Sequence, residues 1–276
     1  SIWDLESVNH YKDQSDIFFT SHEFSYNKIA EAYEPYLGLI RQMFHRYCSG
    51  TLEEFMEECD VYKLQRPVFE SYFENGFCER TEQILIDEVE YEQERMRNSI
   101  VTMLQKLSEI RPVVIVLNRF QLASKSTMQL TNRLLQTKNK NIGIVLGVND
   151  VQSIPEFAHE EWDAICESMD DRNMVYHIGN AGRNMEPDVM DYYSDYESDD
   201  GYRKLNNLVY FLDFDQADHH LSKIERRIKF DNFTISEKKH YQLLLLQIMV
   251  SVLQRDIAKA LESCEDLEKL QDQEKE

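Results

Sequence analysis

One short segment limits the possible folds of this chain more than any other feature. Residues 113–117, Val-Val-Ile-Val-Leu, follow a proline and lead into a polar turn. A continuous apolar run rich in β-branched residues is typical of a strand in the interior of a parallel sheet. A second such run, residues 142–147, follows after a segment long enough for one helix. This alternation of strand and helix predicts an α/β domain with a parallel sheet.

The flanking segments extend the pattern in both directions. Residues 92–107 predict an amphipathic helix that leads into the first strand, because its apolar side chains recur at helical spacing. Residues 17–20 predict a further short strand after a helix within residues 1–16, and residues 174–178 predict a last strand. Together these segments predict one α/β domain over residues 1–183.

The strand at 113–117 and its turn resemble the Walker B segment of the signal-transduction ATPases, the AAA-like STAND class of P-loop proteins that includes LuxR-type regulators. In that family, one or two acids at the end of the strand serve Mg²⁺ and the attacking water. Gln121 fits the turn that follows, but Asn118 and Arg119 stand where the acids would be. Mg²⁺ needs hard anionic oxygen ligands, so the resemblance implies a degenerate Walker B site.

The Walker A motif of that family, Gly-x-x-x-x-Gly-Lys-Ser/Thr, does not occur in the sequence. Residues 179–183, with two glycines, are the segment most similar to such a glycine-rich loop. They could form a phosphate-binding nest, although a plain loop is the simpler interpretation. In the family, the helix and strand predicted for residues 1–20 directly follow the P-loop. We therefore expect ATP as a cofactor only if a P-loop lies upstream. We expect no catalytic residue, no resident metal and no ATPase activity.

Composition excludes several other functions. The chain carries 51 acids against 30 bases, a net charge of −21, and no stripe of Lys and Arg, so direct binding to nucleic acid is not expected. No apolar run approaches the ~20 residues of a membrane span. The five cysteines lack the spacing of metal ligands, although Cys48, Cys59 and Cys78 could bind a metal if the fold gathered them. These features predict a cytoplasmic protein.

An acidic segment separates the predicted α/β domain from the rest. Residues 186–200 hold seven acids and no base, which is typical of a flexible linker or an interaction segment. We therefore predict a linker over residues 184–202. Residues 203–276 follow as an all-helical region.

The helical region contains a possible internal repeat. Two segments resemble the second helix of a tetratricopeptide repeat and align at an offset of 43 residues, longer than the ~34 residues of that repeat. The predicted packing positions pair Phe214 with Ile257, Ala217 with Ala260, Leu221 with Cys264, and Ile224 with Leu267. A generic bundle of helical hairpins is the alternative interpretation.

These observations lead to one main hypothesis about function. The chain is expected to be a non-catalytic signalling or transcription-regulatory module, related to STAND ATPases, that binds protein partners through its helical repeats. The alternative is a nucleotide-binding switch whose P-loop lies upstream of this chain. A hydrolase that uses an unrecognised pair of carboxylates would need two acids converging in a pocket with shifted pKa values.

Overall fold

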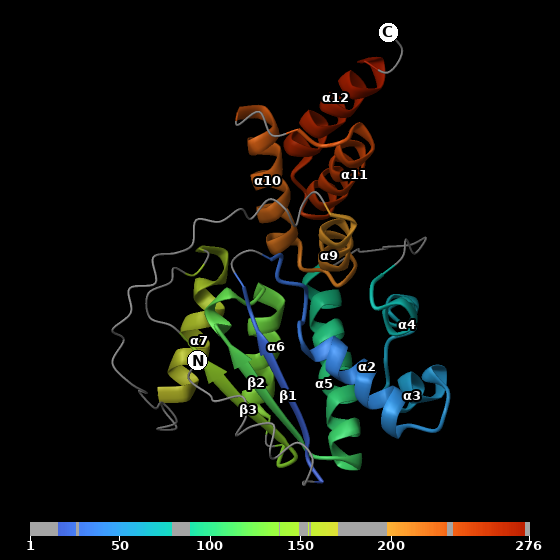
Figure 1. Ribbon diagram of the computed structural model, residues 1–276, viewed down its shortest axis with the longest axis vertical. Coiled ribbons are helices and arrows are strands. Elements are labelled where there is room, and N and C mark those ends of the chain that lie inside the picture. The colour runs from blue at the N-terminus through green and yellow to red at the C-terminus, as the bar shows by residue number, and fades with distance from the viewer. Residues whose placement is uncertain are drawn as a thin grey trace. The chain divides into compact units, whose positions relative to one another are not determined.

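The computed structural model describes residues 16–25, 28–78, 89–137, 139–148, 154, 156–170, 198–230 and 234–273. Its described strands are β1 (Phe18–Glu23), β2 (Val113–Asn118) and β3 (Ile142–Gly147) (Figure 1). The helices before β3 are α2 (Tyr36–Tyr47), α3 (Leu52–Glu58), α4 (Arg66–Asn75), α5 (Val89–Ile110), the 3₁₀ turn η1 (Phe120–Leu122) and α6 (Lys125–Gln136). Those after β3 are η2 (Glu156–Ala158), α7 (His159–Asp170), α9 (Asp199–Tyr210), α10 (Phe214–Phe230), α11 (Glu237–Leu253) and α12 (Ile257–Gln273).

Some predicted features lie outside the described residues. These are the helix within 1–16, the strand at 174–178, the loop at 179–183 and most of the acidic linker. The end of that predicted linker is described and is helical, because the side chain of Ser198 accepts a hydrogen bond from the backbone N–H of Gly201 and caps α9.

The chain divides into two compact units that are not consecutive in sequence. The first contains residues 1–25, 33–61 and 98–191, and the second contains residues 26–32, 62–97 and 192–276. This grouping differs from the division at 184–202 drawn from the sequence, because residues 62–97 pack with the helices that follow Ser198. For example, Phe69 of α4 packs its ring against Phe211, which follows α9.

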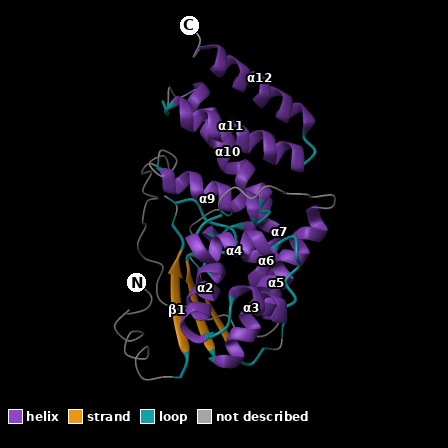
Figure 2. Cartoon of the chain, turned by 90° about the vertical axis from the view of Figure 1, so that its right-hand side faces the viewer, coloured by secondary structure: helices purple, strands orange, loops and turns teal. Residues whose placement is uncertain are grey.

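The first unit contains an all-parallel sheet in the order β1-β2-β3, so the predicted parallel α/β architecture is confirmed at this level. Val113, Ile115 and Leu117 of β2 are fully buried on one face. Figure 2 shows α5 and α6 on the same side of the strands, as right-handed crossovers between successive parallel strands require. On the other face Val145 of β3 is partly exposed, so among the described residues the sheet is covered mainly on one side.

The strand predicted at residues 17–20 is longer than expected. The structure continues β1 through His22 and Glu23, which were interpreted as a loop. The reason is backbone pairing: Ser21, His22 and Glu23 stay in parallel register with β2 up to Asn118. Polar side chains at the end of a strand hide such pairing from a sequence pattern, because only the backbone makes it.

The second unit ends in two helical hairpins, α9–α10 and α11–α12, whose turns have the same geometry (Figure 1). Leu212 and Arg255, 43 residues apart, both adopt the left-handed conformation, with φ of 65° and 63°. An aspartate follows each of these residues, Asp213 or Asp256, at the start of the next helix. Its carboxylate accepts a hydrogen bond from the backbone N–H three residues later. The 43-residue offset seen in the sequence therefore recurs in the backbone.

Candidate functional site

The carboxyl ends of the parallel strands are the first place to look for a site. In open α/β sheets ligands bind outside these ends, at a point where the strand order reverses. Glu23, Asn118 and Gly147 lie side by side at the ends of β1, β2 and β3. The described strands run in one sequential order, so the described part of the sheet contains no such reversal.

Arg119, the residue that follows β2, forms a salt bridge with the neighbouring strand end. Its Nε lies 3.3 Å from Oε1 of Glu23, and its backbone adopts the left-handed conformation with φ of 54°. The pairing neutralises the only acid at the ends of the three strands. A divalent cation would therefore meet a guanidinium where it needs carboxylates.

Asn118 lies close to the end of the next strand. A Cβ atom on Gly147 would come within 2.9 Å of Asn118 Oδ1, which is closer than real Cβ atoms approach. A side chain at position 147 is therefore excluded unless Asn118 moves. The end of the Asn118 side chain therefore lies directly against the backbone of Gly147.

Gln121 was predicted to belong to the site, but the structure places it in the interior. Its side chain is 1% exposed within η1. The first turn of α6, which follows, is held to residues 33–34, because the Tyr33 N–H donates to Ser126 Oγ and Thr127 Oγ1 donates to the Glu34 carbonyl. Gln121 is therefore a buried residue of a packed turn.

Two further bases near the carboxyl edge are also paired with acids. His22 Nε2 lies 3.5 Å from Glu34 Oε1. Lys125, the first residue of α6, lies 3.8 Å from Glu161 Oε1, which also accepts a hydrogen bond from Gln129. The Arg119–Glu23 and Lys125–Glu161 pairs therefore carry compensated charge, whereas His22 contributes a positive charge only when it is protonated.

Only one group of three or more possible metal ligands occurs in the described part of the chain, and it comprises Glu225, Glu262 and Asp266. Lys229 Nζ already lies 2.8, 3.3 and 3.1 Å from their carboxylates. The hydrogen bond that Lys229 donates to Glu225 raises the pKa of Lys229, despite partial burial that acts in the other direction. The ammonium thus supplies the cation of this cluster, and the three acids are a structural ion network.

The cysteines named in the sequence analysis do not form a site in the described residues. Burial is the main reason that the pKa of Cys59 is raised to about 12, and burial also raises the pKa of Cys78. A thiol with a raised pKa is a poor nucleophile and a poor metal ligand, because both functions need the thiolate.

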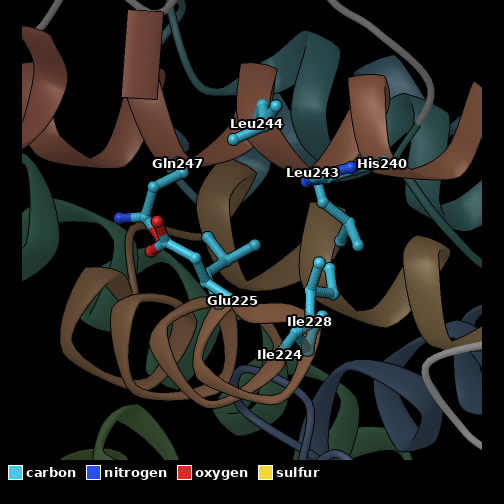
Figure 3. A pocket seen from close by; sticks show the side chains of 8 residues that line it. Ile224, Glu225, Ile228, His240, Leu243, Leu244 and Gln247 are labelled. Atoms are coloured by element: carbon cyan, nitrogen blue, oxygen red, sulfur yellow. The ribbon is translucent and has the colours of Figure 1, made fainter. Parts of the chain in front are cut away.

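A small groove runs between α10 and α11 of the second unit, with a cavity volume of about 20 Å³, on the order of one water molecule. Its walls are mainly apolar and consist of Leu221, Ile224, Glu225, Ile228, His240, Leu243, Leu244 and Gln247. Figure 3 shows Leu243 pointing toward Ile228, and Gln247 pointing toward Glu225. The groove is therefore the seam along which the second hairpin packs on the first.

A polar network joins the two hairpins beside this seam. Lys259 of α12 donates to Asp218 Oδ1 at 2.6 Å and to Ser222 Oγ at 2.8 Å, both on α10. Gln247 of α11 donates to the same oxygen of Asp218 at 2.9 Å. Sequence reasoning missed this network, because the sequence does not show which polar residues of α10, α11 and α12 come together.

The predicted repeat-packing residues behave differently in the two hairpins. Phe214, Ala217, Leu221 and Ile224 of the first are all buried. In the second hairpin Ala260 is buried, Cys264 and Leu267 are half-buried, and Ile257 is 58% exposed. The four residues of the first hairpin are therefore core residues, whereas Ile257 is not, because nothing in the described chain covers that end of α12.

Comparisons with protein-family models, with curated protein sequences and with solved structures found no match for this chain. Among the residues that the structure describes, no helix combines the length and the apolar character that crossing a membrane requires.

Proposed function

We propose that this chain is a non-catalytic regulatory module that acts through protein–protein contacts and is related to STAND-type ATPases. The observation that carries the proposal is the Arg119–Glu23 salt bridge at the carboxyl edge of the sheet. Phosphoryl transfer needs Mg²⁺ and groups that neutralise developing negative charge. Here the guanidinium of Arg119 already pairs with Glu23 of the same chain. Signalling or control of transcription is the output that the resemblance implies.

The helical unit supports the second half of the proposal. Val252, Ile257 and Leu261 of the second hairpin are each at least half exposed. Clustered exposed apolar side chains on a helix pair favour an interaction surface. We assign partner binding to this unit.

The decisive experiment is isothermal titration calorimetry of this chain with ATP and ADP, with and without Mg²⁺, together with an ATPase assay. We expect no heat at millimolar nucleotide and no hydrolysis. Micromolar, Mg²⁺-dependent binding would overturn the proposal. In that case Arg119→Ala should weaken binding, whereas Lys140→Ala should not, because Lys140 is exposed just before β3 at the opposite edge of the sheet.

A nucleotide-binding switch is the second candidate. Sheet topology favours it, because three parallel strands with their crossover helices on one side are the type of scaffold that binds nucleotides. The same titration separates the two candidates, since a switch must bind a nucleotide even when it hydrolyses none.

A further inference from the structure

The way the second hairpin packs on the first identifies one face of α10 as a docking face. The residues of α10 that line the seam with α11 or bond to the second hairpin include Asp218, Leu221, Ser222 and Glu225. At helical spacing these residues form one continuous stripe. The face accepts an apolar helix, α11, and a lysine ammonium, that of Lys259.

The equivalent face of α12 lies 43 residues later and has no helix on it in the described chain. Its residues, together with the first residue of the helix, are Ile257, Leu261, Cys264, Glu265 and Glu268, and we call them the α12 face. Asp218 corresponds to Leu261, which is 61% exposed. Ser222, which accepts from Lys259, corresponds to Glu265, and Glu225 corresponds to Glu268.

The charges of the α12 face indicate what it binds. Glu265 and Glu268 are exposed and form no salt bridge with a described residue. Of the lysines on the same helix, Lys259 bonds to Asp218, and Lys269 bonds to Asp266 and also interacts with Glu265. The face is therefore apolar toward the beginning of α12 and acidic toward its end, where one lysine is shared between two acids.

We propose that the α12 face binds an amphipathic helix of another protein, one that carries Lys or Arg beside its apolar stripe. The apolar residues pack on Ile257 and Leu261, and the basic residues pair with Glu265 and Glu268. A second copy of this chain is disfavoured. Its net charge is −21, so two copies repel each other, and the same face of a second copy would offer Glu265 and Glu268 no basic partner. This inference rests on the proposed function and specifies its partner.

The test uses two labelled synthetic peptides of about 20 residues, long enough to form a helix on binding. Both carry the same leucine stripe, flanked by lysines in one and by glutamates in the other. Fluorescence anisotropy with this chain should show the lysine peptide binding at least about tenfold more tightly than the glutamate peptide, and more weakly at high salt.

Variants locate the binding site. Leu261→Asp should weaken the binding of the lysine peptide by at least about tenfold. The same change at Leu64, which is also exposed but lies in the loop before α4, should leave binding unchanged. The double variant Glu265→Lys/Glu268→Lys should prefer the glutamate peptide. Glu53→Lys/Glu57→Lys alters the net charge equally on exposed positions of α3 and should keep the original preference.

Three outcomes would overturn the inference. Equal loss of binding in both charge variants would show unspecific attraction to an acidic chain. Full binding by Leu261→Asp would place the site elsewhere. A wild-type dimer in sedimentation that Leu261→Asp dissociates would make a second copy the occupant. None of these outcomes bears on the nucleotide titration, so the inference and the proposed function can fail separately.

Discussion

The two helical hairpins of this chain have the same turn geometry, but the residues around the two turns differ in burial. Leu212 and Arg255 adopt the same left-handed backbone, and the aspartate that follows each begins the next helix in the same way. Yet Phe214, just after the first turn, is 2% exposed, and its counterpart Ile257 is 58% exposed. Local sequence sets the turn, whereas burial depends on which neighbours pack against it. The following predictions test that separation, beginning with the largest expected effect.

Truncating the two equivalent apolar residues should have very different costs. Phe214→Ala should lower the free energy of unfolding by about 3–5 kcal/mol, because it removes a fully buried ring and leaves a cavity. Ile257→Ala should change it by less than about 1 kcal/mol, because the side chain is mostly in water. Urea denaturation monitored by circular dichroism measures both. Similar costs for the two variants would mean that Ile257 is covered in solution.

The first hairpin should also be the pH-sensitive one. His220 is buried beside Gln216, and burial, with smaller contributions from His219 and Lys223, lowers its pKa to about 3. The folded state therefore keeps His220 neutral while the unfolded chain protonates it near pH 6.5. Its contribution to stability is complete above that pH and is lost as pH falls toward the folded-state value. By pH 4 the loss should be on the order of 3 kcal/mol.

The variant His220→Gln can keep a polar contact with Gln216 and removes the titration. Between pH 7 and pH 4 it should lose less stability than the wild type. The matched control is Ser263→Ala, at the buried counterpart position in the second hairpin, which should follow the wild-type pH profile. If His220→Gln and the wild type lose stability equally over this range, His220 is not the titrating group.

Glycine at the two left-handed positions should act with opposite signs and small magnitudes. Arg255→Gly should stabilise the protein by about 0.5–1 kcal/mol, because glycine adopts positive φ without the steric cost of a side chain. Leu212→Gly gains the same relief but loses a buried side chain, so it should destabilise by about 1–2 kcal/mol. Thermal unfolding of the two variants measures both shifts. Destabilisation by Arg255→Gly would imply an energetically important contact of the arginine side chain.

Much of the framework could be predicted from the sequence. The runs at 113–117 and 142–147 became β2 and β3, and the helix predicted at 92–107 lies within α5. These predictions succeeded because continuous apolar runs and 3.6-residue periodicity reflect local backbone geometry and burial together. The polar end of β1 was missed, because its pairing with β2 is made by the backbone alone.

The candidate site could be predicted from the sequence only in part. The sequence located Asn118 and Arg119 at the end of a strand, which the structure confirms. Neither the salt bridge of Arg119 with Glu23 nor the burial of Gln121 could be read from it. Both depend on strand register and on packing between segments almost 100 residues apart in the chain.

The sequence by itself determined the parallel strands, the absence of acids at Asn118 and Arg119 where β2 ends, and the 43-residue spacing of the hairpins. These features follow from residue type and short-range periodicity. Only the tertiary structure decided which cation pairs with which acid, which hairpin is buried, and that α12 presents an apolar and acidic face to solvent. Pairing and burial depend on side chains brought together from distant segments, and that proximity exists only after the chain has folded.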